Sequence, residues 1–464
     1  MMTVKGRPIL TAAETKAAEQ ALFAQGVSVF ALMTRAGRAA ADILWDRYGP
    51  RPTLVLCGPG NNGGDGYVIA ARLRARGVTV RVAASGEPNT DAARAARELW
   101  GGDVEPLDRA APADIVVDAL FGTGLSRPLD AEIAGPAERL LAAARYRVAI
   151  DLPSGIATDD GAVLTSLPAV DCTVALGALK RAHRLLPAVA RCGAVVVADI
   201  GLHDLPRGVI EIARPAIATP GFEANKYTRG KVLVVAGAMP GATMLSALAA
   251  QRAGAGYVEL VGSEGSGVPH ALVRRAWDEA ALADKRVGAI VIGPGLGADE
   301  AARARLDAAL ATDRPLVLDA DALSLLAKQG LDRLPDRIAP MVLTPHMGEY
   351  ARLFPDVEGS ALDKAREGAR RSGAILLLKG ACTVIAHPDG RAMIDPPAPA
   401  WLASAGTGDV LAGVLGTMLA QQDDPFAAAA AAVWLHAAAA RRAGPLLIAD
   451  DLVSHLSAAV ESCL

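Results

Sequence analysis

Short, continuously apolar runs recur along almost the whole chain, and each is followed by a segment with helix-like spacing. Such runs are typical of strands buried on both faces, as in a parallel sheet covered by helices. At 464 residues the chain is too long for one ordinary hydrophobic core. We therefore predict an α/β fold with two domains, each a three-layer αβα arrangement. In the first half the runs are TLVLC at 53, VTVRVA at 78, DIVVDAL at 114, RVAID at 147, CTVAL at 172 and AVVVADIG at 194.

The segment from Leu202 to Thr228 interrupts this alternation. It is rich in proline and glycine and shows no sustained period, which is typical of a linker. A second series of runs then begins, so we predict one domain over residues 1–214 and another over residues 215–464. The runs of the second series are KVLVVAG at 231, GYVELV at 256, GAIVIGPG at 288, PLVLDAD at 315, MVLTPH at 341, AILLLKG at 374 and CTVIA at 382.

A helical arm is predicted ahead of the first run. Thr11 and Glu14 have capping-box spacing and precede apolar positions at helical intervals. Gly26 is suited to end this helix.

The charge balance and the cysteines limit the classes of partner and the compartment. With 47 basic and 50 acidic residues, the net charge of −3 gives no electrostatic footprint for nucleic acid or an anionic membrane. The five cysteines are an odd number and widely scattered, which favours a reducing compartment. The N-terminus has no apolar signal region, and the alanine-rich stretch from Phe426 to Ala440 is too short to span a bilayer. We expect a cytoplasmic protein with small-molecule ligands and without nucleic-acid or membrane partners.

A glycine-rich segment, GPGNNGGDG at 58–66, follows the first strand and precedes a helix that we predict from Tyr67. Backbone N–H groups at such a strand-to-helix junction favour an anionic ligand. Gly58, Gly60 and Gly63 match the dinucleotide pattern GxGxxG, which is weak by itself. The acidic residue expected at the end of the next strand is replaced by Arg81, a hint of a 2′-phosphate.

Two further polar loops follow later strands of the first half. DALFGTGLSRP begins at Asp118, and DLPSG begins at Asp151. In an open parallel sheet such loops share one edge, so we expect Asn62, Asp118, Asp151 and Ser154 to converge on one crevice where oxygen donors can hold a cation. The alternative for each residue alone is that it only forms a turn.

The motifs GPGNNGGDGYV, DALFGTGLSRP and AIDLPSGI, in this order, resemble the NAD(P)H-hydrate epimerase family over residues 8–205. The resemblance implies a Rossmann-like domain in which Asp151 is the catalytic acid/base and Asn62, Asp118 and Ser154 bind potassium. A carboxylate at a strand end suits proton transfer near a ring. The implied substrate contacts are Asn61, Asn62, Gly63, Gly64, Asp65, Gly122, Thr123, Gly124, Leu125, Ser126, Arg127, Pro128 and Asp151.

In the second half, the most informative motif is AGTGD at 405–409, at the start of the apolar helix DVLAGVLGTML. Small residues leave the first N–H groups of the helix open to a phosphoryl group in transfer, and Asp409 is placed to take a proton from the attacking hydroxyl. The alternative is an aspartate that only caps the helix.

Three other features of the second half have open alternatives. His346 in LTPH is either a ligand-facing residue or a packed core histidine, and GPGLG at 293–297 is either a ligand loop or a tight turn. Lys379 in LLLKGACTVI brings a cation toward phosphates or is a lysine that happens to end a strand. The sequence contains no GxxxxGK[ST] motif, which argues against a P-loop NTPase.

Together with KYTRGKVLVVAG, GAT, RAGAGYV and LDADAL, these motifs resemble the carbohydrate-kinase-like ADP/ATP-dependent NAD(P)H-hydrate dehydratases over residues 223–464. The resemblance implies a ribokinase-like domain that uses ADP and Mg²⁺, with ADP favoured because the fused order resembles the bacterial enzymes. The implied hydrate contacts are Ala242, Gly297, His346 and Asp409, with Asp409 catalytic. The implied nucleotide contacts are Lys379, Gly380, Ala381, Cys382, Thr383 and Gly408.

These resemblances imply a bifunctional enzyme that epimerises (R)- and (S)-NAD(P)H hydrates, NADHX and NADPHX, and dehydrates the S form at the expense of ADP. We expect a homo-oligomer, with the N-terminal arm contributing to dimerisation. The rival hypotheses are an NADP-dependent oxidoreductase, suggested by GPGNNG and Arg81, a small-molecule kinase, suggested by AGTGD, and a binding module with a decayed site.

Overall fold

The computed structural model describes residues 6–265, 267, 269–332 and 334–464. The chain separates into two compact units, residues 7–209 and residues 210–464, the second of which also includes Gly6. Each unit is described by itself. Among the described residues, every helix is too short or too polar to cross a membrane.

The first unit is built on a seven-stranded sheet in which all neighbouring strands are parallel. The order β4-β3-β2-β5-β6-β7-β9 reverses direction between β2 and β5, as in a Rossmann-like sheet. Ligands of such sheets bind at the carboxyl ends of the strands beside this reversal. The strands are β2 (Thr53–Cys57), β3 (Val80–Ala84), β4 (Glu105–Pro106), β5 (Ile115–Ala119), β6 (Tyr146–Ile150), β7 (Cys172–Leu176) and β9 (Ala194–Ala198).

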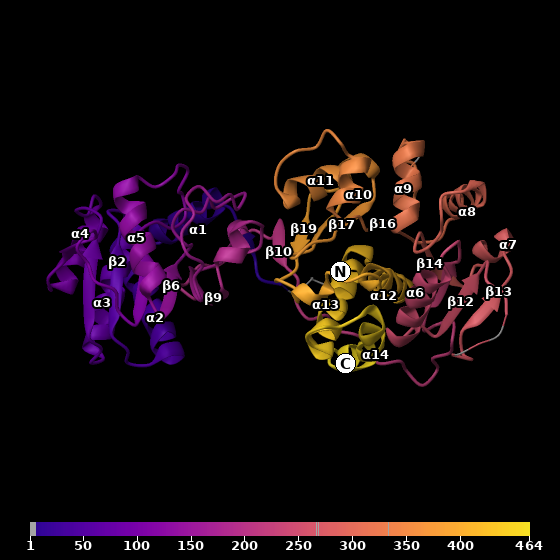
Figure 1. Cartoon of the computed structure of the whole chain (residues 1–464), viewed down its shortest axis with the longest axis horizontal. Coiled ribbons are helices and arrows are strands. Elements are labelled where there is room, and N and C mark those ends of the chain that lie inside the picture. The colour runs from indigo at the N-terminus through magenta and orange to yellow at the C-terminus, as the bar shows by residue number, and fades with distance from the viewer. Residues whose placement is uncertain (1–5, 266, 268, 333) are drawn as a thin grey trace. The chain divides into compact units, whose positions relative to one another are not determined.

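Helices cover both faces of this sheet, so the predicted three-layer architecture is confirmed (Figure 1). On one face the side chains of alternate strand residues, such as Val55 and Val117, pack against α2, α3 and α4. On the other face Leu54 and Val116 pack against α5. The helices are α2 (Val29–Tyr48), α3 (Asn61–Ala75), α4 (Asp91–Trp100) and α5 (Ala131–Ala143).

The predicted start of the helix after β2 is wrong. Helix α3 begins at Asn61 rather than Tyr67, so the glycine-rich segment forms its first turns. Glycines disfavour a helix because of their backbone entropy, but here close packing requires them. A Cβ at Gly63 would lie 1.8 Å from the Gly58 carbonyl oxygen, and one at Gly66 would lie 2.9 Å from Cys57 Sγ.

The N-terminal arm folds as predicted. Helix α1 (Ala12–Ala24) begins with a capping box: Glu14 N–H donates to Thr11 Oγ1 at 3.0 Å, and Thr11 N–H donates to the Glu14 carboxylate at 2.8 Å. Just before it, strand β1 (Ile9–Leu10) pairs in parallel with β8 (Leu179–Lys180). This small sheet ties the arm to the segment that carries Lys180.

The second unit contains a ten-stranded sheet ordered β10-β19-β18-β17-β16-β15-β14-β11-β12-β13. Its centre is parallel as predicted, but β18 is antiparallel to both β17 and β19. The strands are β10 (Val209–Glu211), β11 (Lys231–Val235), β12 (Tyr257–Val261), β13 (Val273–Arg275), β14 (Val287–Ile292), β15 (Leu316–Leu318), β16 (Met341–Leu343), β17 (Ile375–Leu378), β18 (Val384–Ala386) and β19 (Ala392–Ile394).

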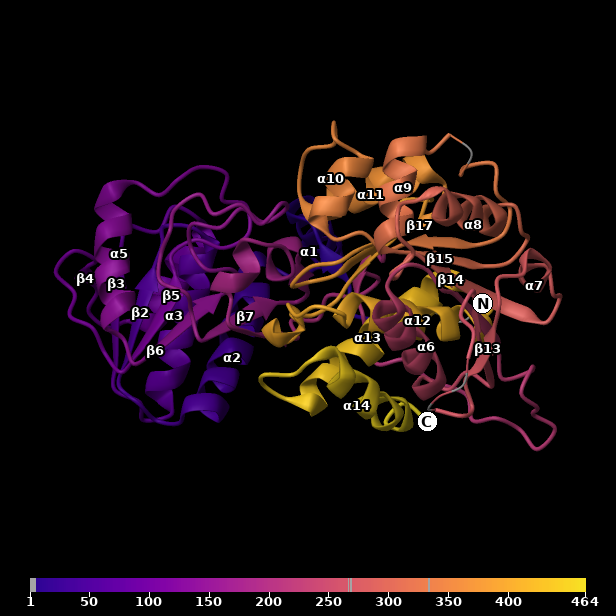
Figure 2. The same cartoon turned by 45° about the vertical axis from the view of Figure 1, so that its right-hand side comes forward.

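Two groups of helices cover the two faces of this sheet (Figures 1 and 2). The helices α6, α12, α13 and α14 form one layer, and the apolar stretch around Phe426 is buried in it against strand residues such as Val234 and Val291. The other layer contains α8 to α11. The helices are α6 (Pro240–Arg252), α7 (Glu279–Leu282), α8 (Glu300–Leu310), α9 (Ala320–Gln329), α10 (Met347–Leu353), α11 (Ala361–Ser372), α12 (Thr407–Gln421), α13 (Pro425–Ala443) and α14 (Ala449–Glu461).

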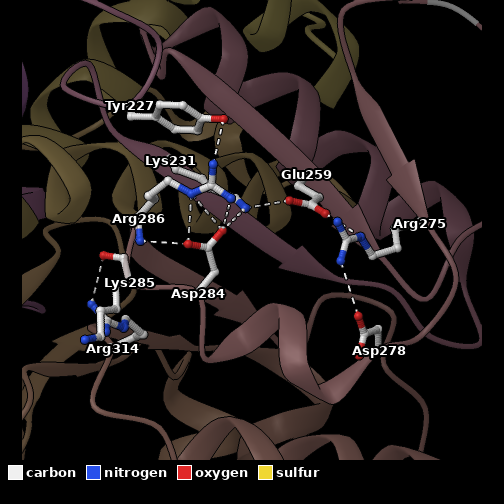
Figure 3. Close-up of polar contacts among 9 residues, drawn as sticks. All are labelled: Tyr227, Lys231, Glu259, Arg275, Asp278, Asp284, Lys285, Arg286 and Arg314. Atoms are coloured by element: carbon white, nitrogen blue, oxygen red, sulfur yellow. Dashed lines mark hydrogen bonds and ion pairs between the residues drawn. The ribbon is translucent and has the colours of Figure 1, made fainter.

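A buried ion-pair network contains Lys231, the first residue of β11, and Glu259 of the adjacent strand β12 (Figure 3). Lys231 Nζ lies 2.7 Å from Glu259 Oε2 and 3.0 Å from Asp284 Oδ2. Arg275 Nε lies 2.8 Å from Glu259 Oε1. The Glu259 side chain is only 1% exposed, so Lys231 and Arg275 must offset the cost of burying its charge.

Candidate active sites

Asp151 lies directly after β6 in the first unit, with a buried side chain and a backbone φ of 65°. A left-handed conformation is unfavourable for a residue with a Cβ and is often found at functional positions. The loop after β5 supplies hydrogen bonds: Thr123 N–H donates to Asp151 Oδ2 at 3.1 Å, and Thr123 Oγ1 donates at 2.5 Å. The structure therefore brings two of the three predicted loops together at Asp151.

A lysine that the sequence motifs did not flag completes this group. Lys180 of β8 donates a hydrogen bond to Asp151 Oδ1 and another, of 2.7 Å, to the Leu176 carbonyl oxygen. Burial raises the pKa of the Asp151 carboxyl, but the Lys180 ammonium and the Thr123 hydroxyl outweigh it, so the net pKa lies below its ordinary value. Asp151 is therefore ionised at neutral pH.

His183 fixes the backbone beneath this ion pair. Its Nδ1 accepts the Lys180 N–H at 2.9 Å, so its Nε2 carries the proton and donates to the Asp151 carbonyl oxygen at 2.7 Å. Burial lowers the pKa of His183 to about 3, which keeps the ring neutral. This histidine, like Lys180, was not identified from the sequence.

Asp118 and Ser154 form the second group of the first unit. Ser154 donates to the Asp118 carboxylate through its hydroxyl at 2.6 Å and its N–H at 2.8 Å. Asp118 is 1% exposed, and burial raises the pKa of its carboxyl despite these hydrogen bonds. Among the ion pairs of the described residues, none involves Asp118.

Asn62 lies close to the same loop. A Cβ at Gly122 would meet Asn62 Oδ1 at 3.0 Å and Asp151 Cβ at 3.2 Å, so the three residues are tightly packed. The Asn62 amide nitrogen is buried and has no hydrogen-bond partner in the described structure. A buried, unsatisfied amide next to a predicted ligand site is consistent with a ligand that supplies the missing partner.

The other predicted contacts of the first unit differ in their burial and in their hydrogen bonds. Gly63, Gly64 and Asp65 are buried in the first turns of α3, and burial, followed by the charges of Asp151 and Glu19, raises the pKa of Asp65 well above its usual range. Asn61 instead accepts a hydrogen bond of 2.7 Å from Thr90 at the start of α4. The remaining predicted loop residues are all at least partly exposed: Gly124, Leu125, Ser126, Arg127 and Pro128.

In the second unit, the reversal of the sheet lies between β11 and β14. The segments after these two strands touch: Met239 N–H donates to the Gly295 carbonyl oxygen at 2.9 Å. A Cβ at Gly297, whose φ is 87°, would lie 3.1 Å from Ala238 Cβ, and one at Gly295 would lie 3.1 Å from Ala242 Cβ. Ala242 and the GPGLG segment therefore line the same strand ends.

His346 and Lys379 follow the neighbouring strands β16 and β17 and form a parallel bridge. The His346 side chain is 56% exposed, so the alternative of a packed core histidine is wrong. Its Nδ1 accepts N–H groups from Gly348 at 2.9 Å and Glu349 at 3.3 Å. Because Nδ1 accepts these hydrogen bonds, Nε2 is the ring nitrogen that can donate.

Lys379 is held beside the start of α12. Its ammonium donates to Asp319 Oδ1 at 2.7 Å and lies 4.0 Å from Glu349 Oε2. A Cβ at Gly408 would lie 3.4 Å from Lys379 Nζ, so the ammonium lies directly beside this glycine. The segment Gly380 to Thr383 continues from this lysine, and Cys382 within it is buried.

Asp409 lies in the first turn of α12 among charged groups from other strand ends. Burial, followed by the carboxylate of Asp319, raises the pKa of Asp409 to about 6, although the Lys379 ammonium partly offsets this. Its backbone carbonyl accepts a hydrogen bond of 2.7 Å from Ser246 of α6, and His436 holds the Thr407 carbonyl oxygen at 2.9 Å. A carboxylate with this pKa suits a general base near neutral pH.

Comparison with known proteins gives a match in each of the two units. A family model described as NAD(P)H-hydrate dehydratase matches residues 232–458, and the YjeF-related protein N-terminus model matches residues 29–182. The chain is 39% identical to the bifunctional NAD(P)H-hydrate repair enzyme Nnr of Gloeobacter violaceus, over 93% of this chain and 92% of that protein. It is 36% identical to the Salinibacter ruber enzyme of the same name, over 96% and 95% of the two chains.

The chain belongs to the family of bifunctional NAD(P)H-hydrate repair enzymes. The relative from Escherichia coli is 35% identical over 89% of this chain and 85% of its own length. Among solved structures, the ADP/ATP-dependent NAD(P)H-hydrate dehydratase of Bacillus subtilis, co-crystallised with ATP/Mg²⁺, is 31% identical and covers 54% of this chain and 95% of its own, with a TM-score of 0.46. The family resemblance that we drew from the motifs is thus confirmed.

Membership of this NAD(P)H-hydrate repair family removes the support for the rival hypotheses. The oxidoreductase hypothesis depended on Arg81 as a contact for a 2′-phosphate. In the structure Arg81 pairs with Glu105 at 2.9 Å and donates to the Ala111 carbonyl oxygen. Its guanidinium is thus occupied within the first unit.

Proposed function

We propose that the first unit interconverts the R and S hydrates of NADH and NADPH, and that the second dehydrates the S hydrate with ADP, giving AMP and phosphate. The observation that carries this proposal is that two carboxylates near strand ends, one in each unit, have pKa values shifted in opposite directions. Asp151 is held ionised by Lys180, whereas Asp409 has a pKa raised to about 6 in the first turn of α12, which we assign to phosphate binding.

Epimerisation at the hydroxyl-bearing carbon requires the hydroxyl to leave with a proton and water to return to the other face with loss of a proton. Asp151 is suited to accept the proton from water because its lowered pKa keeps the carboxylate ionised at neutral pH. Asp65 is suited to supply a proton because its pKa is raised. Carboxyl groups whose pKa values are pushed apart are typical of acid–base pairs.

Potassium is the cation that we assign to the first unit. Asp118, Ser154 and Asn62 would hold it, since the buried Asp118 carboxylate accepts hydrogen bonds but makes no ion pair within the part of the chain that the structure describes. The orphaned amide of Asn62 fits the same interpretation, because turning it would present its carbonyl oxygen. Bound there, potassium would supply positive charge beside the substrate loop.

In the second unit, Asp409 removes the proton from the hydroxyl group of the S hydrate. The oxygen of that hydroxyl attacks the β-phosphorus of ADP, and AMP leaves. The phosphate ester then loses phosphate together with a proton from the adjacent carbon, which restores the ring double bond. Phosphate leaves far more readily than hydroxide, which explains a dehydratase on a kinase-like scaffold. Ala242, Gly297 and His346 are assigned to the hydrate, and Lys379 to Thr383 and Gly408 to the nucleotide.

The same strand ends fit a nucleotide that carries Mg²⁺. Asp409 is influenced by three other carboxylates, Asp319, Asp321 and Glu349, but by only one lysine, Lys379, so negative charge is in excess. Asp321 and Glu349 would hold the ion, with phosphates and water as its remaining ligands. When bound, Mg²⁺ neutralises charge on the phosphates during transfer.

We place the functional boundary between residues 214 and 215, close to the structural division at residue 210. Cytoplasmic location is proposed because all five cysteines are buried free thiols. A homo-oligomer, with the N-terminal arm at its interface, also remains part of the proposal.

Incubation of the full chain with mixed NADHX epimers, Mg²⁺ and ADP tests the assignment. ADP-dependent recovery of reduced-nicotinamide absorbance, with AMP as product, is the expected result. Efficient turnover with ATP and none with ADP would refute the choice of donor, and a stable phosphorylated product would identify a kinase instead.

A further inference from the structure

Asp319 is a buried carboxylate at the carboxyl end of β15. It lies in the motif LDADAL, but the family resemblance implies no role for it. Its side chain is 2% exposed, and it precedes α9 without making a side-chain hydrogen bond to that helix. An aspartate at this position ordinarily caps the helix. Here the carboxylate instead accepts the Lys379 ammonium at 2.7 Å.

The turn that carries Asp319 is fixed by its neighbours. The next residue, Ala320, has a φ of 45°, a conformation that a residue with a Cβ adopts only when its surroundings impose it. A Cβ at Gly293 would lie 1.8 Å from the Asp319 carbonyl oxygen, and Asp321 accepts the Gly297 N–H at 2.8 Å. The turn is therefore locked against the GPGLG segment.

The ion pair faces the open end of α12. A Cβ at Gly408 would lie 3.4 Å from Lys379 Nζ and 4.0 Å from Asp319 Oδ2. The other charged groups around the lysine are Glu349 and Asp409. Without Asp319, the Lys379 ammonium would be free to move toward either of these carboxylates and away from its position beside Gly408.

We propose that Asp319 is a positioning residue for phosphoryl transfer, which holds the Lys379 ammonium against the amino end of α12, where the nucleotide phosphates bind. This inference rests on the proposed dehydratase function of the second unit. It predicts that Asp319 acts on the nucleotide through Lys379, and not on the hydrate.

The test is a double-mutant cycle in the full chain with D319N, K379M and the combined variant. Asn is nearly isosteric with Asp, and D319N should lower kcat/KM for ADP by about 10- to 100-fold, mostly as a rise in KM. KM for the S hydrate should stay unchanged. In the K379M background, D319N should change kcat/KM for ADP by less than about twofold. D319E should recover part of the loss, and D299N, which alters only an exposed helix cap, should behave as wild type.

Two outcomes of the activity measurements would overturn the proposal. If D319N and K379M multiply their effects, Asp319 does not act through the lysine. If KM for the hydrate rises as much as KM for ADP, the substitution has only loosened the turn that holds Gly297. Calorimetric binding of ADP to the same variants, run beside the activity assay, decides the matter independently. If wild type binds ADP but does not dehydrate the hydrate, the dehydratase function is refuted, and the ADP affinities of the same variants still test the role of Asp319. If wild type does not bind ADP, the positioning role is refuted.

Discussion

Lys180 and Asp151 form a buried ion pair in the first unit, with side chains that are 1% and 9% exposed. The lysine comes from β8, a two-residue strand held by the N-terminal arm, whereas the aspartate follows a strand of the main sheet. Since a buried charge is costly unless it is paired, the Lys180 ammonium favours the ionised form of Asp151.

Replacing Lys180 with Met is expected to abolish epimerisation, because Asp151 would then be a buried carboxyl without its counter-charge. Removing one partner of a buried pair typically costs about 3–5 kcal/mol in stability, so thermal unfolding is measured together with the epimerisation rate. The exposed Lys16 on α1 provides the control, and K16M should retain the thermal stability and the epimerisation rate of wild type. Normal epimerisation by K180M would show that the pair is dispensable.

Changing Asp118 to Asn should remove the potassium dependence of epimerisation and leave dehydration intact. The carboxylate is the only charged group among the three proposed potassium ligands, and its loss should weaken potassium binding by about 10- to 100-fold. The rate is measured against potassium concentration, with sodium as the comparison and the exposed D130N as the matched variant. Unchanged stimulation of D118N by potassium would place the cation elsewhere.

Dehydration should rise with pH through about 6, because Asp409 must be deprotonated to act as a base and its pKa is raised to about 6. The raised pKa means that the folded state holds this proton more tightly than the unfolded chain. The stability contributed by Asp409 is thus greatest at low pH and declines as pH rises from about 4 to about 6. D409N should therefore be at least as stable as wild type at neutral pH, yet dehydrate about 10²- to 10⁴-fold more slowly. Near-normal dehydration by D409N would reject Asp409 as the base.

Glu259 should be essential to the stability of the second unit. E259Q leaves Lys231 and Arg275 without their shared buried partner (Figure 3), which should cost about 3–5 kcal/mol. Loss of dehydratase activity with increasing urea reports on this unit, and loss of epimerase activity reports on the other. In E259Q only the urea midpoint for loss of dehydratase activity should fall. E300Q, on the exposed start of α8, should leave the midpoints of both activities unchanged. An unshifted dehydratase midpoint would mean that the network contributes little.

Much of this architecture could be predicted from the sequence, because each buried parallel strand is a continuous apolar run. The runs at 53 and 231 became β2 and β11, and the polar residues after such runs lie at one sheet edge as expected. The start of α3 was misplaced, because glycines suggest a loop, and only the packing of Gly63 and Gly66 against the sheet reveals the helix.

Lys180 and Asp319 were missed for a different reason. Neither lies in a glycine-rich segment, and an isolated lysine or aspartate carries no local signal of burial. Their roles depend on partners 29 and 60 residues away in the chain, which only the folded structure brings together. The antiparallel strand β18 was likewise hidden, since its apolar run, CTVIA, has the same composition as the parallel ones.

The central claim, two separate activities with one substrate pool, is tested most directly by the completeness of NADH recovery from an equal mixture of R and S hydrates with ADP and Mg²⁺. Wild type should recover the whole mixture, whereas D151N should rapidly recover the S half and then proceed only at the uncatalysed epimerisation rate. D409N should recover none while still interconverting the epimers, as resolved by chromatography. Complete rapid recovery by D151N, or no ADP-dependent recovery by wild type, would contradict the account.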